Sequence, residues 1–329
     1  MKLYRLDLVN FRNYAKRSFE FGDQTLIIGE NGAGKSNILE AIYLMATGKS
    51  FRADRDEEMI SYGEQYSVLS AQCSEIELKV TITDRKKFEI NGVGRRMMDF
   101  VGKLKAVLFA PTDIELITGS PGSRRRYLDF VIMQFDREYR RSLISYERGL
   151  RQRNKLLEMM RESLAQRSQL FFWDRLLIKD GDYISQARSR YLSGLSNNKY
   201  QINYDKSVIS ETRLKQYEVE EVAAATTLVG PHRDDFIILQ NGRNVSKFGS
   251  RGEQRMTMLF LKLGEMAALS DGDLPILLLD DIFSELDHKH REEVLQIVAR
   301  HQLAGGQTIM TSADEHLLPE STASAIIRL

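Results

Sequence analysis

Polar and apolar positions in the first third of the chain alternate with a period of two. The alternation runs through Lys2–Val9 and again through Tyr66–Ile90, where Asn91-Gly92 supplies the residues of a tight hairpin turn. The short apolar run Thr25–Ile28 leads directly into a glycine-rich segment. We therefore expect strands in this part of the chain, with an antiparallel sheet over residues 66–90.

The middle of the chain changes to a helical period. Between about Ser123 and Ser196 the apolar positions recur every three to four residues and proline is absent, which predicts a helical insertion. Gly149, Gly181 and Gly194 are the expected breaks in it. The segment is too short for a long coiled-coil arm.

The last third returns to short strands and helices, which predicts an α/β core assembled from both ends of the chain. We expect helices after Ser250 and over Asp287–Arg300. The expected strands are Gln201–Tyr204, Asp235–Leu239, Pro275–Asp281 and Gln307–Thr311.

Composition is that of an ordinary globular protein. The chain has 329 residues, of which 42% are hydrophobic, enough for two domains or for one domain with a large insertion. Cys73 is the single cysteine, so an intramolecular disulfide is excluded. The first residues lack the apolar core of a signal peptide, and no apolar run reaches transmembrane length. We expect a cytoplasmic protein that does not enter a membrane.

The net charge of +1 conceals a basic region between Ser120 and Gln169, in which arginine dominates. On charge alone, a patch that binds polyanions and an ordinary solvated helix face fit this region equally well. The arginines that would contact DNA are Arg124, Arg125, Arg126, Arg140, Arg141 and Arg151.

The glycine-rich segment fits the pattern G-x-x-x-x-G-K-[ST] and lies between an expected strand and an expected helix, as a phosphate-binding loop requires. Its backbone N–H groups would cradle the phosphates of ATP, Lys35 would contact the β- and γ-phosphates, and Ser36 would be a ligand of Mg²⁺. The residues of this expected site are Gly29, Glu30, Asn31, Gly32, Ala33, Gly34, Lys35, Ser36 and Asn37.

Two acids follow the apolar strand that begins at Pro275. Asp280 is placed to hold Mg²⁺, and Asp281 would project to the other side of the strand. We assign Asp281 to polarising the attacking water and, together with Lys35, to catalysis; the alternative is that Asp281 only caps the following turn.

A second motif begins at Ser250 and has the pattern S-x-G-x-Q, formed by Ser250, Gly252 and Gln254. Ser250 with Glu253 also reads as a capping box, which by itself implies only a well-capped helix. What changes this interpretation is the order of the motifs: the phosphate loop, the S-x-G-x-Q segment, the strand with two acids, and then Ser284-Glu285-Leu286-Asp287. In that order they resemble the motifs of ABC-type ATPase heads.

This resemblance implies that the head dimerises head to tail, with the second motif of one subunit closing over ATP held by the other. Each site would be incomplete in the monomer. ATP would then act as a population switch, because hydrolysis removes contacts that hold the interface closed.

Further stretches narrow the resemblance to the RecF family of bacterial recombination proteins, in the family's order along the chain. They are Asn10-Phe11-Arg12-Asn13-Tyr14, Gly48-Lys49-Ser50-Phe51-Arg52, Gly119–Asp129, Gly230-Pro231-His232-Arg233-Asp234-Asp235 and Leu277–Asp287. The resemblance implies an SMC-like ABC ATPase head, without long coiled coils, at residues 1–115 and 225–329, with an inserted, mainly helical lobe at 116–224. It also adds Arg12 and Asn13 to the nucleotide-binding residues.

By the same resemblance, the protein would dimerise with ATP on double-stranded or gapped DNA. It would act with RecO and RecR to help load RecA in recombinational repair and the SOS response, and the basic insertion would face DNA. Its ATPase would be weak and stimulated by DNA.

The chain also departs from related patterns. Thr112 stands where the family usually has an acid, and Gln307–Asp314 contains no histidine where ABC transporters have a switch histidine. Thr311 or Ser312 is expected near the γ-phosphate instead. We expect slow hydrolysis, which triggers release from DNA.

Several residues keep two readings. His232 fits a structural turn better than a ligand or base, and Arg52 fits a γ-phosphate or DNA contact and a surface ion pair equally. Phe171, Phe172 and Trp173 are expected to pack in a small core rather than to stack on bases.

Two other classes of protein compete with this reading. The nucleotide-binding subunit of an ABC transporter would be expected to carry the switch histidine and an Asp-Glu pair instead of Asp280-Asp281. A small-molecule P-loop kinase would have no use for the motif at Ser250.

Overall fold

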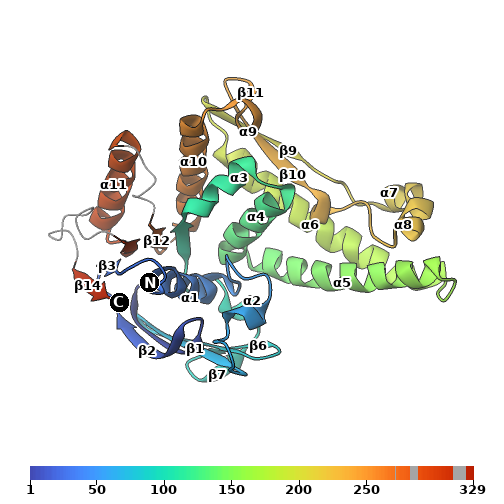
Figure 1. The fold of residues 1–329 in the computed structure, drawn as a ribbon. Helices are drawn as coiled ribbons and strands as arrows, with labels where there is room; N and C mark the ends of the chain where they lie inside the picture. The colour runs from blue at the N-terminus through green and yellow to red at the C-terminus, as the bar shows by residue number, and fades with distance from the viewer. Residues whose placement is uncertain (271, 282–287, 314–323) are drawn as a thin grey trace. The chain divides into compact units, whose positions relative to one another are not determined.

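The computed structural model describes residues 1–270, 272–281, 288–313 and 324–329, which divide between two compact units (Figure 1). Unit 1 combines Met1–Asp113 with Lys262–Leu329, and unit 2 is Ile114–Leu261. Unit 2 therefore extends beyond the helical lobe expected at 116–224, and the Ser250 motif falls within it.

The core of unit 1 is a five-stranded parallel sheet with the order β14-β3-β13-β12-β8. Strands from the two ends of the chain alternate in it, which confirms the expected α/β core built from both ends. The strands are β3 (Gln24–Ile28), β8 (Ala106–Phe109), β12 (Ile276–Asp280), β13 (Thr308–Ser312) and β14 (Ala325–Arg328). Every residue of the first four is buried, as is usual for a parallel sheet covered on both faces.

The second sheet of unit 1 is antiparallel and six-stranded, with the order β2-β1-β4-β5-β6-β7. Asn91 and Gly92 both have positive φ and join β6 to β7, so the expected hairpin is confirmed. The strands are β1 (Leu3–Phe11), β2 (Tyr14–Glu20), β4 (Ser67–Cys73), β5 (Glu77–Ile82), β6 (Lys86–Ile90) and β7 (Val93–Arg95).

Helix α1 (Lys35–Thr47) contacts strands of both sheets and is buried along most of its length. The side-chain amide of Gln307 also ties the two sheets together: its Oε1 accepts from the Leu3 N–H at 2.8 Å, and its Nε2 donates to the Leu3 carbonyl at 2.7 Å. The other helices wholly within unit 1 are the 3-10 helix η1 (Asp56–Met59), α2 (Met97–Phe100) and α11 (His288–Leu303). The 3-10 helix η2 (Pro111–Ile114) lies where the chain enters unit 2.

Unit 2 is mainly helical, as expected. Two 25-residue helices, α5 (Arg137–Arg161) and α6 (Phe171–Leu195), pack against each other and are joined through η3 (Arg167–Leu170). The remaining helices are α3 (Glu115–Thr118), α4 (Pro121–Phe135), α7 (Glu211–Gln216), α8 (Glu218–Ala224), η4 (Pro231–Arg233) and α9 (Val245–Phe248).

A three-stranded antiparallel sheet, β11-β10-β9, completes unit 2. Its strands are β9 (Tyr200–Asp205), β10 (Asp235–Gln240) and β11 (Arg243–Asn244). Helix α10 (Arg251–Leu269) begins in unit 2 and ends in unit 1, because the boundary between the units falls between Leu261 and Lys262.

The glycines of the insertion do not break its helices, contrary to expectation. Gly149 lies inside α5, and Gly181 and Gly194 lie inside α6. A Cβ at Gly149 would stand 2.6 Å from Leu176 Cδ2, and one at Gly181 would stand 2.9 Å from Ile209 Cγ2. At these two positions the missing side chain permits close packing between elements.

The expected small aromatic core at the start of α6 is also wrong. Phe171 and Phe172 are each 64% exposed, whereas Leu170 and Leu177 are buried. The helical period of the buried leucines places both phenylalanines on the outer side of the helix. The Arg175 guanidinium lies 5.7 Å from the centre of the Phe171 ring, and Phe172 packs edge-on against Trp173.

Among the described residues, no helix is long and apolar enough to cross a membrane.

Candidate nucleotide site

The glycine-rich loop lies between β3 and α1, at the carboxyl edge of the parallel sheet. Gly34 has φ 106° and ends the loop, and no side chain caps the helix that follows. A Cβ at Gly34 would stand 2.6 Å from both Asn13 Nδ2 and the Tyr14 hydroxyl, so glycine is required here for conformation and for space. The uncapped N-terminus of α1 suits an anion.

The Lys35 ammonium is turned into the loop. The side chain is 7% exposed and donates to the Gly29 carbonyl at 2.6 Å and to the Glu30 carbonyl at 3.0 Å. Backbone carbonyls are neutral acceptors, and a phosphate oxygen is a stronger one. The ammonium is therefore placed to exchange these contacts for phosphate.

Ser36 and Asp280 meet across the sheet edge, although they are 244 positions apart in sequence. The Ser36 hydroxyl donates to Asp280 Oδ1 at 2.8 Å, and the Thr311 hydroxyl donates to the same oxygen at 2.9 Å. β12 lies next to β13 in register, which places Asp280 opposite Thr311. These hard oxygen donors suit Mg²⁺, whose remaining ligands would be phosphate and water.

Asp281 follows directly, with φ 46°, and its backbone N–H donates to Thr311 Oγ1 at 3.0 Å. Thr311 thus contacts both acids, and its neighbour Ser312 is buried. Thr311, one of the two residues expected in place of the switch histidine, is therefore bonded to both acids.

Asn13, Asn37 and Arg52 form the rim of the loop. Asn13 Nδ2 donates to the Ala33 carbonyl at 3.1 Å, and Asn37 Nδ2 donates to Asn13 Oδ1 at 2.9 Å. Arg52 Nη1 donates to Asn37 Oδ1 at 2.9 Å. Arg52 is thus joined to the nucleotide site through an amide rather than through a surface carboxylate.

Arg12 was expected to bind nucleotide, but its guanidinium is held by Glu40 of α1. Nε and Nη2 donate to the two carboxylate oxygens at 2.8 and 2.6 Å, and Nη1 donates to the Glu58 carbonyl at 2.6 Å. No sequence pattern predicted this pair, because its two residues lie on different elements and belong to no shared motif.

The Tyr14 hydroxyl is buried beside the loop and has no hydrogen-bond partner within the described chain. Burial raises the pKa of this phenol to about 12. A buried polar atom without a partner is destabilising, and a ligand or water could satisfy it.

A buried ionic cluster lies elsewhere in unit 1. Lys262 of α10 is 3.3 Å from Asp113 and 3.3 Å from Glu265. Burial raises the pKa of Glu265 to about 7, and Lys262 opposes this shift only in part. No sequence motif marked this cluster.

The second motif forms the expected capping box at the start of α10. The Ser250 N–H donates to Glu253 Oε2 at 2.7 Å, and the Glu253 N–H donates to Ser250 Oγ at 3.3 Å. The contact with the Ser250 N–H lowers the pKa of Glu253. Gln254 bonds the Val245 carbonyl at 3.4 Å, and Ser250 is exposed.

The six arginines expected to contact DNA divide into two groups. Arg124 binds Asp235 through two nitrogens at 2.7 and 2.9 Å, and Arg140, 8% exposed, donates to the Met133 carbonyl. Arg125 is partly buried and donates to the Asp234 carbonyl at 2.8 Å. The three that are exposed are Arg126, Arg141 and Arg151, of which Arg141 pairs with Glu138. Some arginines of this basic region thus bind carboxylate or carbonyl groups within unit 2, whereas others add positive charge to its surface.

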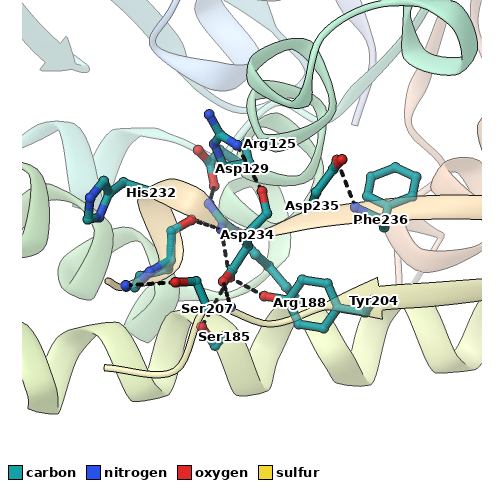
Figure 2. Close-up of polar contacts among 12 residues, drawn as sticks. Arg125, Asp129, Ser185, Arg188, Tyr204, Ser207, His232, Asp234, Asp235 and Phe236 are labelled. Carbon is teal, nitrogen blue, oxygen red and sulfur yellow. Dashed lines mark hydrogen bonds and ion pairs between the residues drawn. The ribbon is translucent and has the colours of Figure 1, made fainter. Parts of the chain in front are cut away.

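Figure 2 shows a polar network of unit 2 around Asp234, which is fully buried. Asp234 Oδ1 accepts from the Ser207 N–H at 2.7 Å. Oδ2 accepts from Ser185 Oγ at 3.1 Å, from Arg188 Nη1 at 3.2 Å and from the Tyr204 hydroxyl. Both oxygens of this carboxylate therefore accept hydrogen bonds from groups of unit 2.

His232 is part of the same network and is held as a neutral imidazole. Its Nε2 lies 3.0 Å from the Thr227 carbonyl, which can only accept, so Nδ1 accepts from the Tyr146 hydroxyl at 2.8 Å. Burial lowers the pKa of His232 to about 4. This geometry is that of a structural histidine.

The segment Ser284-Glu285-Leu286-Asp287, together with Ile282, Phe283 and Asp314, lies outside the described residues.

A loop that precedes a buried helix at the edge of a parallel sheet, with an acid from the next strand but one against its serine, defines a P-loop nucleotide-binding fold. The family model of the RecF/RecN/SMC N terminal domain matches residues 2–329. Two Smc heads, one of them from Pyrococcus furiosus, share the fold at 17% identity and a TM-score of 0.51.

Two relatives described as DNA replication and repair protein RecF, from Shouchella clausii and Herpetosiphon aurantiacus, are each 36% identical to the chain. The matches cover 98% and 100% of this chain and 96% and 97% of the relatives. A solved structure of the recombination mediator protein RecF-ATP in the RecFOR pathway is 30% identical, with a TM-score of 0.85 over 100% of this chain and 97% of that one. The chain belongs to the RecF family.

Proposed function

We propose that this protein is an ATP-dependent DNA-binding protein of recombinational repair. In this proposal it acts in the RecFOR pathway, which is the pathway given for its structural relative. The observation that carries the proposal is the 2.8 Å contact between Ser36 and Asp280 beside the inward-turned Lys35. It joins a phosphate-binding loop to a metal-binding acid on β12, which lies two strands away from β3 in the sheet. The names of the relatives supply the pathway.

The residues divide the chemistry between them. The loop from Gly29 to Ser36 holds the phosphates, Lys35 neutralises charge on the β- and γ-phosphates, and Asp281 orients the attacking water. Ser36 and Asp280 would hold Mg²⁺, which supplies charge neutralisation at the phosphates. Hydrolysis is slow and weakens the hold on DNA.

The site is completed by a second copy of the chain. Ser250, Gly252 and Gln254 begin a helix whose cap is exposed, and in a head-to-tail dimer they face the γ-phosphate bound by the partner. ATP therefore favours the dimer.

Exposed arginines of unit 2 contact the phosphates of double-stranded or gapped DNA. The proposal keeps Arg126, Arg141 and Arg151 because they are exposed, and leaves out Arg124, Arg125 and Arg140, which are less exposed and bind groups of unit 2. Binding of this kind depends on salt and is weakly sequence-specific. The protein partner is RecR, and RecO and RecA act in the same pathway.

Oligomeric state and double-stranded DNA affinity, each measured with ATP, ADP and no nucleotide, test the proposal. ATP should produce the dimer and strengthen DNA binding. Lys35→Met should weaken ATP binding or abolish hydrolysis, whereas Ser250→Arg should bind ATP and stay monomeric.

Ser193→Arg is the matched control, because Ser193 is also exposed in unit 2 but lies far along the sequence from the motif. It should dimerise as the wild type does. A Ser250→Arg protein that dimerises and hydrolyses ATP normally would refute the assignment of the shared site.

The alternative considered from the sequence, the nucleotide-binding subunit of an ABC transporter, is not kept, because the chain belongs to the RecF family.

A further inference from the structure

The Glu40 carboxylate is buried in the middle of α1, on the helix that begins with Lys35. Its exposed fraction is 0%, and it accepts two hydrogen bonds from Arg12, at 2.8 and 2.6 Å, and one from the Ser50 hydroxyl. Arg12 lies in the turn between β1 and β2, and Ser50 lies in the segment after α1. One carboxylate therefore joins the helix to two separate loops.

Each of these loops continues to the rim of the phosphate loop. Next to Arg12, Asn13 donates to the Ala33 carbonyl at 3.1 Å. Ser50 Oγ accepts the N–H groups of Arg52 and Ala53 at 2.9 and 2.8 Å, and the Arg52 side chain then donates to Asn37. The two rim side chains are thus each one or two residues from a group bound by Glu40.

The turn at Arg12 needs such support. Arg12 has φ 52°, and Asn10 has φ 51°. A non-glycine residue in this region is strained and persists only where surrounding contacts hold it in place. The two-pronged contact with Glu40, and the Arg12 N–H bond to the Met59 carbonyl at 2.9 Å, provide that constraint.

We propose that Glu40 is a positioning residue for nucleotide binding, which acts by fixing Asn13 and Arg52 at the rim of the phosphate loop. The inference rests on the proposed function, because it assumes that the loop binds ATP. Glu40 does not touch the nucleotide. Its effect is therefore on ATP affinity and on the KM for ATP, rather than on turnover at saturation.

Glu40→Gln in the full chain tests this, with ATP affinity measured by calorimetry alongside KM, kcat and Tm. We expect ATP affinity to fall and KM to rise about tenfold, with kcat within about twofold of wild type. Glu221→Gln is the control, because it alters another buried carboxylate that binds an arginine, Arg153, but lies in unit 2, which contains none of the phosphate-loop residues. It should leave ATP affinity unchanged whatever it does to Tm.

A double-mutant cycle separates positioning from general stabilisation. If Glu40 acts through the rim, Glu40→Gln should cost less than about threefold in an Asn13→Ala background. Ser50→Ala, which removes the hydroxyl that joins Glu40 to the Arg52 loop and preserves the charged pair, should weaken ATP binding about threefold and serves if Glu40→Gln fails to fold.

Unchanged ATP affinity in the folded variants, or full additivity with Asn13→Ala, would overturn the proposal. Failure of the wild-type chain to bind ATP would instead refute the proposed function.

Discussion

Asp280 and Asp234 are both buried aspartates, at 8% and 0% exposure, yet their surroundings differ in kind. Asp234 binds the Arg188 guanidinium, two hydroxyls and a backbone N–H. Asp280 accepts from two hydroxyls, and no cation among the described residues lies within ion-pair distance of it. A buried carboxylate that is paired with a cation and hydrogen-bonded within the protein has a structural role. A buried carboxylate without a cation is placed to bind a ligand that supplies a cation.

The same substitution at both positions turns this contrast into an experiment. Asp234→Asn leaves Arg188 with a weakened partner inside the protein, so we expect a loss of about 3–5 kcal/mol in the free energy of unfolding, measured by urea denaturation. ATP affinity of the protein that remains folded should not change. Asp182→Asn, at a half-exposed pair with Lys206, should change stability by less than about 0.5 kcal/mol. A small loss at Asp234 would show that the network is not a scaffold.

Asp280→Asn should have the opposite effects, with little change in stability and a large loss of ATP turnover. Removing a buried charge that lacks a cation should leave the free energy of unfolding within about 1 kcal/mol of wild type. ATP turnover should fall by about 100-fold or more, because the metal-binding oxygen is lost. Stopped-flow or steady-state hydrolysis at several Mg²⁺ concentrations measures this; wild-type turnover in the variant would contradict the metal assignment.

The scaffold reading of the Asp234 network also predicts a pH dependence at His232. Its pKa is lowered from 6.5 to about 4 in the folded protein, so the unfolded chain binds the proton more readily. The contribution to stability is complete above pH 6.5 and is lost as pH falls towards 4, by at most about 3 kcal/mol.

His232→Gln, which can still donate to Thr227 and accept from Tyr146, should remove this part of the pH dependence. The difference in unfolding free energy between wild type and variant, measured from pH 7.5 to 4, should therefore vary with pH. A difference that is constant over this range would show that His232 is not held neutral.

Tyr14→Phe should give the smallest effect and tests the ligand side of the comparison. The hydroxyl has no partner within the described chain, so its removal should change stability by less than about 1 kcal/mol. ATP affinity should fall about two- to tenfold if the ligand satisfies this atom, as one neutral hydrogen bond would. A loss of stability with unchanged ATP affinity would show that Tyr14 has a structural role.

Local motifs predicted the strand, loop and helix around the candidate nucleotide site, because each depends on residues that are neighbours in sequence. The strand, the loop and the helix around Lys35 are contiguous, and Asp280 ends a strand whose apolar run is evident. The partners of Arg12 and Asp234 were not predictable in this way, because pairs such as Arg12 and Glu40 form only when separate elements pack together.

The same limit explains the errors in unit 2. Charge alone does not tell a surface arginine from Arg140, whose guanidinium is turned inward. A glycine in a helical pattern reads as a break, whereas Gly149 lies where two helices approach closely. The helical period around Phe171 was sufficient to predict that its side chain is exposed. Its aromatic neighbours suggested a small hydrophobic core instead.

The strand order of the parallel sheet has a consequence for biosynthesis. β3 is made early, but both of its neighbours, β13 and β14, come from the last residues of the chain. Unit 2 can therefore leave the ribosome complete while β3 of unit 1 still has open edges, a state exposed to aggregation. The phosphate loop is synthesised among the first residues, yet Asp280 and Thr311 reach it among the last, so competence to bind nucleotide reports that the whole chain has folded.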